Sequence, residues 1–260
     1  EVWLSNTVDH HNHYTPNLTL LNGILSTGHY FSFFPYWSAN VSGWCQDALK
    51  GDRKKQVYLN LCSSRWLFIP EGFSPGRFAF PEESFKGMTA YRNPDAITRA
   101  SVVFSYRLFA DEGHLLTFLE SPDMFDPRRE LAVLRQDAEE WGLRPGTGGR
   151  GATAISTEAS IVVDRPDRVE LQLKSASPEG AFLILNDTYY PGWRALVDGV
   201  ETKVVRTNYA FRGIKLPEGT EHVVFFFDPL VPDTVLPLPT VLLAALGMAL
   251  LFRHYLIQKG

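Results

Sequence analysis

The sequence predicts an α+β fold: a mixed N-terminal unit, then an antiparallel β-sandwich, then one transmembrane helix at the C-terminal end. The first part of the chain alternates helical and strand periodicity, and the second part consists of closely spaced strands of period two. A Gly-rich stretch, GLRPGTGGRGA, separates these parts, and a long uncharged apolar run ends the chain. We therefore expect a mixed domain over 1–141, a linker over 142–153, a sandwich over 154–230 and a membrane helix over 234–257.

Helical and strand-like segments alternate in the N-terminal unit. Residues 46–61 have a helical pattern that Gly51 interrupts, and residues 111–120 predict a second, shorter helix. Residues 65–69 form an apolar run, and strands are predicted over 87–92, 101–107 and 130–136.

Strands dominate the unit after the linker. Val169, Leu171 and Leu173 alternate with polar residues, as in a strand with one buried face and one solvent-exposed face. Asp198-Gly199 predicts a tight hairpin, because both positions tolerate positive φ. Further strands are predicted over 181–185, 193–197, 201–206, 210–216 and 222–227.

The uncharged run from Thr234 to Phe252 approaches the length of about 20 residues that a spanning helix needs. Pro239 suits the first turn of a helix, and Arg253 and Lys259 follow the run. The positive-inside bias then places the C-terminus in the cytoplasm and residues 1–233 outside it. The alternative is a buried core helix or a tail docked on a partner.

The composition narrows the class of protein. Hydrophobic residues make up 45% and charged residues 21%, which is a globular balance. The formal charge is −4 and the basic residues are scattered, so nucleic acid is not an expected partner.

The first residues contain no signal-peptide core, so we expect an upstream membrane segment of a longer protein to deliver this part. Cys45 and Cys62 either pair as a disulfide or remain two buried thiols.

Residues 181–230 carry a family resemblance. They contain the turn Tyr189-Tyr190-Pro191-Gly192-Trp193, then a Val-Asp-Gly hairpin, the segment NYAFRG over 208–213, a Pro-Glu-Gly turn and His222. In order and spacing this segment resembles the C-terminal extracytoplasmic region of the YfhO-type bacterial membrane proteins. Weaker matches lie over 20–32, 61–69, 91–94 and 100–104.

The resemblance implies a membrane-embedded glycosyltransferase that uses polyprenyl-phosphate sugars and acts on cell-envelope polymers. In that class the catalytic carboxylate lies among the first membrane helices, so no catalytic residue is assigned in this chain. The resemblance also implies the bacterial cell membrane as location and an upstream transmembrane bundle as partner. It assigns no cofactor to this part, while a divalent metal in the parent protein remains open.

Candidate ligand-binding residues gather at the Tyr-Tyr-Pro-Gly-Trp turn. Its rings offer a flat platform for sugar rings, and neighbouring polar side chains offer hydrogen bonds to hydroxyls or phosphate. The alternative is that the rings pack the end of the sandwich. The candidates are Asp187, Tyr189, Tyr190, Trp193, Arg194, Asn208 and Arg212.

The most metal-like cluster is Asp9, His10, His11 and His13. Imidazoles with a carboxylate suit zinc, but a site needs three or four converging ligands and no partner at a diagnostic spacing follows. A solvated loop is the favoured interpretation, and no metal is assigned. Phosphate-loop, nucleophile-elbow and zinc-protease motifs are absent from the sequence.

Three functions follow from these patterns. The leading one is an extracytoplasmic part of a glycosyltransferase that binds acceptor glycan or covers the active site. The alternative is a non-catalytic, membrane-anchored carbohydrate-binding or assembly module. The third is a metal-dependent hydrolase built on the histidine cluster.

Overall fold

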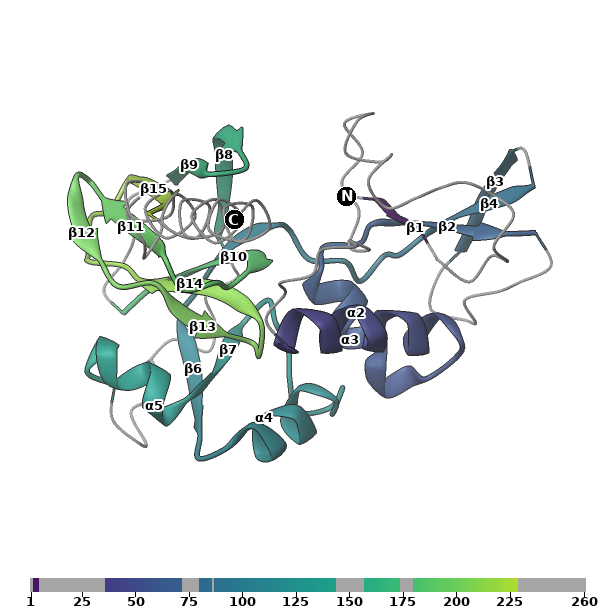
Figure 1. Cartoon of the computed structure of the whole chain (residues 1–260), viewed down its shortest axis with the longest axis horizontal. Helices are drawn as coiled ribbons and strands as arrows, with labels where there is room; N and C mark the ends of the chain where they lie inside the picture. Colours follow the sequence, from purple (N-terminus) through teal and green to yellow (C-terminus); the bar gives the residue numbers. More distant parts are fainter. Residues whose placement is uncertain are drawn as a thin grey trace, which may run out of the picture.

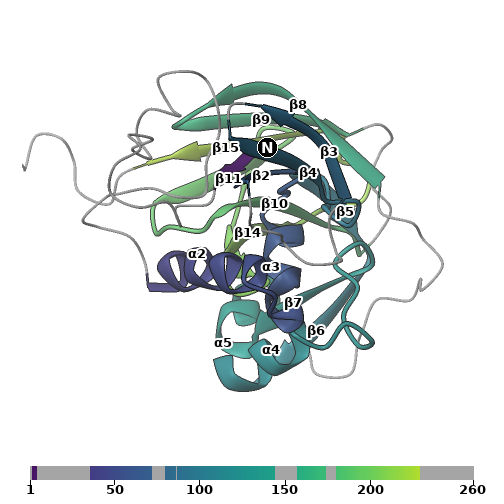
Figure 2. The same cartoon turned by 90° about the vertical axis from the view of Figure 1, so that its right-hand side faces the viewer.

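The computed structural model describes residues 2–4, 36–71, 80–85, 87–143, 157–173 and 180–228. These residues form a mixed α+β structure in which most strand pairs are antiparallel, which confirms the predicted α+β class. A nine-stranded and a four-stranded sheet lie at opposite ends of the long axis (Figure 1). Helices α2 to α5 gather on the opposite side of the molecule from the larger sheets (Figure 2).

The nine-stranded sheet has the order β12-β11-β15-β9-β8-β5-β10-β14-β13, and every neighbouring pair is antiparallel. The bounds are β5 (Ala100–Val103), β8 (Thr157–Arg165), β9 (Arg168–Leu173), β10 (Phe182–Thr188), β11 (Trp193–Val197), β12 (Val200–Thr202), β13 (Val205–Thr207), β14 (Phe211–Lys215) and β15 (His222–Phe227).

Strand β8 joins the two arms of this sheet. Its first residues, Thr157 and Glu158, pair with β5, and the residues from Ala159 onward pair with β9. Side chains of both arms meet in one apolar core, in which Leu171 and Phe225 come from one arm and Leu183 from the other. The sheet thus turns back on itself around a shared core.

Local sequence signals explain much of this sheet. In β9, Val169, Leu171 and Leu173 are buried and the residues between them face outward, as the period of two predicts. Asp198 and Gly199 have φ values of 47° and 84°, and Val197 pairs with Val200 across the turn. The predicted Asp-Gly hairpin is therefore confirmed.

Two predicted strands are each divided in the structure. Residues 101–107 belong to β5 and to β6 (Ser105–Phe109), which leaves the large sheet and pairs in parallel with β7 (Glu130–Leu134). Residues 201–206 belong to β12 and β13, which lie at opposite edges of the nine-stranded sheet. Periodicity alone does not reveal where a chain changes its pairing partner, because the pattern along one segment does not identify the strand beside it.

The helices are short. They are α2 (Tyr36–Leu49), the 3₁₀ turn η1 (Arg53–Lys55), α3 (Gln56–Leu61), α4 (Glu112–Leu119), α5 (Arg135–Ala138) and the 3₁₀ turn η3 (Glu139–Trp141). Gly51, with a φ of 107°, lies between α2 and η1, where the sequence predicts an interruption. Asp111 caps α4 by accepting a hydrogen bond from the His114 amide at 3.0 Å.

The four-stranded sheet has the order β1-β2-β4-β3. Its strands are β1 (Val2–Leu4), β2 (Trp66–Pro70), β3 (Phe80–Phe85) and β4 (Met88–Arg92). Strand β4 was predicted, and β2 covers most of the apolar run over 65–69. Strand β3 contains Pro81 and two glutamates and gave no strand signal.

The hydrophobic core crosses the predicted domain boundary. Val103 and Leu131 from the N-terminal part pack in one cluster with Phe182 and Val205 from the C-terminal part. Strand β5 lies between β8 and β10 within the nine-stranded sheet. Much of the predicted linker lies outside the described residues, and the described parts on either side of it share a sheet and a core.

The predicted membrane helix over 234–257 lies outside the described residues, and so does the cluster of Asp9, His10, His11 and His13. Within the described ranges, no helix combines the length and the apolar character needed to cross a bilayer.

Candidate functional site

The Tyr189–Trp193 turn connects β10 to β11 and is fixed by backbone contacts. The Tyr189 amide donates to the Ala210 carbonyl at 2.7 Å, and the Trp193 amide donates to the Tyr190 carbonyl at 3.3 Å. Gly192 has a φ of 106°, and a Cβ atom there would lie 2.9 Å from the Asp228 carbonyl oxygen. Only glycine satisfies both the backbone angle and this close approach, so this conformation of the turn depends on Gly192.

The aromatic rings of the turn differ in what they offer to solvent. Tyr190 is 42% exposed, and its ring centroid lies 6.1 Å from that of Phe227. Trp193 is half-buried at 5.6 Å from the same ring, and the Arg212 guanidinium lies 3.5 Å from its centroid. Arg212 thus covers one face of Trp193, and Tyr190 is the most exposed ring of the turn.

Tyr189 faces helix α2. The Trp37 indole N–H donates to the Tyr189 carbonyl at 3.0 Å, and the two ring centroids are 6.2 Å apart. Asn40, one helical turn further on, donates to the Tyr209 hydroxyl at 2.7 Å. Helix α2 therefore supports the turn from the N-terminal part of the chain, and the sequence did not predict this role for Trp37 or Asn40.

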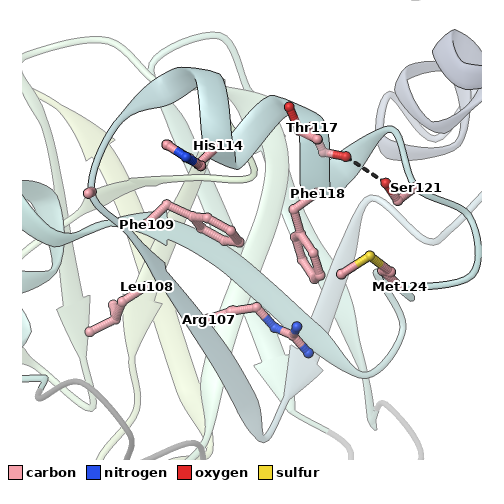
Figure 3. A pocket seen from close by; sticks show the side chains of 9 residues that line it. Arg107, Leu108, Phe109, His114, Thr117, Phe118, Ser121 and Met124 are labelled. Atoms are coloured by element: carbon pink, nitrogen blue, oxygen red, sulfur yellow. Dashed lines mark hydrogen bonds between the residues drawn. The ribbon is translucent and has the colours of Figure 1, made fainter.

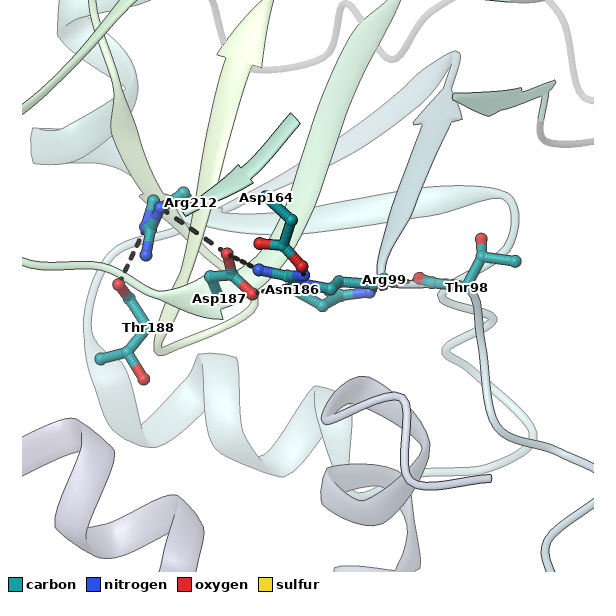
Figure 4. Close-up of polar contacts among 7 residues, drawn as sticks. All are labelled: Thr98, Arg99, Asp164, Asn186, Asp187, Thr188 and Arg212. Carbon is teal, nitrogen blue, oxygen red and sulfur yellow. Dashed lines mark hydrogen bonds and ion pairs between the residues drawn. The ribbon is translucent and has the colours of Figure 1, made fainter. Parts of the chain in front are cut away.

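An ion-pair network lies beside the turn (Figure 4). Arg99 binds both carboxylate oxygens of Asp187, at 2.8 Å and 2.9 Å, and binds Asp164 at 2.6 Å. Arg212 lies 3.7 Å from Asp187 and donates to the Thr188 carbonyl at 3.0 Å. Four segments far apart in the sequence are thereby linked through Arg99 and Asp187.

Burial determines the electrostatics of this network. The side chains of Arg99, Asp187 and Arg212 expose 18%, 16% and 8% of their surface. Burial lowers the pKa of Arg212 to about 10, although Asp187 opposes that shift, and nearby Arg99 lowers the pKa further. Burial also disfavours the Arg99 cation, but its hydrogen bonds to Asp187 and Asp164 raise its pKa overall. Both arginines are charged at neutral pH, so Asp187 and Asp164 together balance two cations that are largely buried.

Asn186 fixes the position of Arg99. Its side-chain amide donates to the Thr98 carbonyl at 2.9 Å, and its backbone N–H donates to the Arg99 carbonyl at 2.7 Å. The guanidinium of Arg99 is thus held by backbone pairing as well as by its carboxylate partners.

Five of the predicted ligand-binding residues lie at or beside the turn in the structure: Asp187, Tyr189, Tyr190, Trp193 and Arg212. The other two, Arg194 and Asn208, have structural partners elsewhere. Arg194 donates to both carboxylate oxygens of Glu201, at 2.7 Å and 2.6 Å, and also to Asp228. Asn208 is fully buried, and its carboxamide oxygen accepts from the Ala132 amide at 2.8 Å. Arg194 therefore links β11 to Glu201 in β12 and to Asp228 after β15, and Asn208 links the end of β13 to β7.

A separate hollow lies between α4 and β6, with a volume of about 410 Å³ (Figure 3). Phe109, Phe118 and Met124 give it a mainly apolar lining, and the Arg107 guanidinium lies 4.5 Å from the Phe118 ring. The His114 ring contacts Asp111 at 2.7 Å, but Asp111 is the N-cap of α4 and this contact belongs to the cap. The sequence did not predict this hollow, because its lining residues are mainly apolar and come from a strand, a helix and the segment after that helix.

Two further features bear on chemistry. The thiols of Cys45 and Cys62 are both buried, and their Sγ atoms lie 3.9 Å apart, farther than the length of a disulfide bond. Among the described residues, no three His, Cys, Asp or Glu side chains converge in a way that would hold a metal ion.

Comparison with known proteins returned no matching family model, no matching curated protein and no matching solved structure. The interpretation of the site therefore rests on its own geometry and on the sequence patterns.

Proposed function

We propose that this chain is the extracytoplasmic C-terminal part of a polytopic, YfhO-like membrane protein, and that it binds acceptor glycan beside the transferase active site. The parent protein is then a polyprenyl-phosphate-sugar-dependent glycosyltransferase that acts on cell-envelope polymers. The resemblance of residues 181–230 to that family supports the assignment, and the uncharged run before Arg253 supports the membrane attachment.

One observation carries the binding role: an exposed aromatic ring stands on a hydrogen-bonded turn beside polar groups. Tyr190 is exposed, backbone hydrogen bonds of Tyr189 and Trp193 hold the turn, and the Phe227 ring packs against the Tyr190 ring. A preformed aromatic surface binds at a lower entropic cost than a flexible loop, because little ordering remains to be done. Sugar rings, with one apolar face and several hydroxyls, match such a surface.

The charged groups beside the turn favour binding over catalysis within this part. Arg99 and Arg212 are occupied by Asp187, and Arg194 is occupied by Glu201 and Asp228. A general acid or base has to exchange a proton with its substrate, and carboxylates locked to buried arginines are poorly suited to that role. The same pairing favours the alternative function, a non-catalytic membrane-anchored module that binds carbohydrate or assembles other proteins.

Glycan titration tests the binding role. We expect calorimetry of the whole chain with soluble envelope polysaccharide to give saturable binding, and Tyr190→Ala to weaken it at least tenfold. Val200→Ala is the matched control, because Val200 is 71% exposed but begins β12 and pairs with Val197, at the end of β11 that is distant from the turn. Equal affinity of the two variants, or no binding by the native chain, would refute the proposed surface. Trp193→Ala is a poorer choice, because it also uncovers Arg212.

Labelling of intact cells tests the orientation. Glu218 is exposed in the turn before β15, so Glu218→Cys in the complete open reading frame provides an accessible thiol. We expect a membrane-impermeant maleimide to modify it in intact bacterial cells. Modification only after the membrane has been permeabilised would place this part in the cytoplasm and overturn the proposal. Sequence upstream of Glu1 separates the two functions, because a transferase requires many further membrane segments and an early acidic loop residue.

A further inference from the structure

We propose that Cys45 and Cys62 are joined by a disulfide that forms while the chain folds in an oxidising compartment, and that this bond fixes the helix supporting the candidate glycan-binding turn. The compartment rests on the proposed function, whereas the pairing itself rests on the structure.

The pairing follows from where the two sulfur atoms lie. Cys45 is in the second half of α2, and Cys62 ends α3 at its C-cap position. The chain contains two cysteines, and their Sγ atoms lie 3.9 Å apart although 17 positions separate them in the sequence. A disulfide has an S–S distance of about 2.05 Å, so the sulfurs need to approach each other by roughly 2 Å.

The bond forms by thiol–disulfide exchange with an enzyme of the oxidoreductase class. The thiolate of one cysteine attacks a sulfur of the oxidant's disulfide and releases one oxidant thiol. The second cysteine then attacks the mixed disulfide, forms the Cys45–Cys62 bond and releases the second thiol. The two cysteines lose two protons and two electrons, and the oxidant is reduced to a dithiol.

Burial determines when this exchange takes place. Cys45 has no exposed surface and Cys62 exposes 7%. The contact with Cys62, together with burial, raises the pKa of the Cys45 thiol, so little thiolate exists in the folded protein. The bond therefore forms before α2 and α3 have packed, and the folded protein afterwards shields it from reductants.

The bond acts on the proposed binding turn through α2. The N-terminal half of this helix contacts the C-terminal part of the chain, through Trp37 at the Tyr189 carbonyl and Asn40 at the Tyr209 hydroxyl. A link at Cys45 fixes the other half of the same helix to α3. The helix is then held at both ends, and the turn keeps a fixed support.

Peptide mapping tests the pairing. Lys50, Arg53, Lys54 and Lys55 lie between the two cysteines, so trypsin separates them unless a disulfide joins their peptides. Membranes from cells expressing the complete open reading frame are treated with N-ethylmaleimide during lysis and digested without reductant. We expect the linked Cys45–Cys62 peptide pair, and in the Cys62→Ala variant an alkylated Cys45 after denaturation.

Refolding gives a second readout. The denatured, reduced chain is refolded with oxidised glutathione, and we expect the linked peptide pair together with a roughly 100-fold lower ratio of unfolded to folded protein than without the bond. The folded, reduced chain is expected to react with maleimide far more slowly than the denatured chain.

The outcomes separate this proposal from the proposed function. Alkylated, unlinked cysteines in cells whose Glu218→Cys variant is labelled from outside would overturn the disulfide. If Glu218→Cys is labelled only after permeabilisation, the proposed location fails and the refolding experiment decides the pairing. Linked peptides then support the pairing, and two free thiols after refolding with oxidised glutathione overturn it.

Discussion

Asp187→Asn is the sharpest test of the ion-pair network beside the turn. The substitution keeps the shape of the side chain and removes one negative charge. Arg99, Arg212, Asp164 and Asp187 are neutral together, so the variant leaves one uncompensated positive charge among side chains of which three are less than a fifth exposed. The new amide N–H group also faces the Arg99 guanidinium, a donor facing a donor.

Breaking a buried ion pair by removing one partner costs about 3–5 kcal/mol. Because Asp164 remains as a partner of Arg99, we expect a loss of about 3 kcal/mol, at the lower end of that range. Urea denaturation at pH 7, followed by tryptophan fluorescence, measures it. With a slope of about 3 kcal/mol per molar, the midpoint falls by roughly 1 M.

Glu201→Gln provides the matched control. It breaks the two-point contact of Glu201 with Arg194, a pair of similar geometry whose side chains are 51% and 44% exposed. Solvent screens that pair, so we expect no resolvable shift of the midpoint. Equal midpoints for Asp187→Asn and Glu201→Gln would refute the view that burial makes this network stabilising.

Three further predictions concern single residues. Gly192→Ala is expected to lower the free energy of unfolding, measured by urea denaturation, by about 3 kcal/mol, because the new Cβ meets Asp228 and Phe227. Gly199→Ala, which has open space around it, is expected to lower it by about 1 kcal/mol. Equal losses would contradict the proposed clash. Asn208→Ala is expected to cost about 2 kcal/mol by the same assay, since the buried Ala132 amide loses its acceptor, and an unchanged midpoint would be inconsistent with that bond. Burial raises the pKa of Glu130 despite Arg107, so the folded state binds its proton more tightly than the unfolded state does. Its contribution to stability is therefore full below the usual pKa and is lost as pH rises through the folded value; Glu130→Gln should flatten this part of the stability profile against pH, and an unchanged profile would count against it.

The sequence predicts the parts of the fold that depend on neighbours along the chain. The period of two in β9 and the Asp-Gly hairpin match the structure because both are set by local backbone preferences. The interruption at Gly51 also matches, since it depends on the φ value of a single residue. The first half of α2 was missed, although Val41, Cys45 and Ala48 recur at helical spacing and are all buried.

Long-range partners could not be predicted. Arg99 binds Asp187 across 88 positions in the sequence, and nothing in the pattern around either residue identifies the other. From the sequence, the polar side chain of Asn208 could bind either a ligand or another part of the protein. Only the fold shows that its partner is the Ala132 amide. Side-chain type was thus informative about chemistry, while the choice of partner depended on the arrangement of the strands.

The position of β5 limits how the chain can be shortened. A fragment that begins after the Gly-rich stretch contains eight of the nine strands of the large sheet but lacks the one between β8 and β10. Such a fragment opens two unprotected edges in the middle of an apolar surface, and unprotected edges invite aggregation. Any truncated version intended for expression or grafting therefore needs residues 100–103, so the part of the chain after the Gly-rich stretch is not an autonomous module.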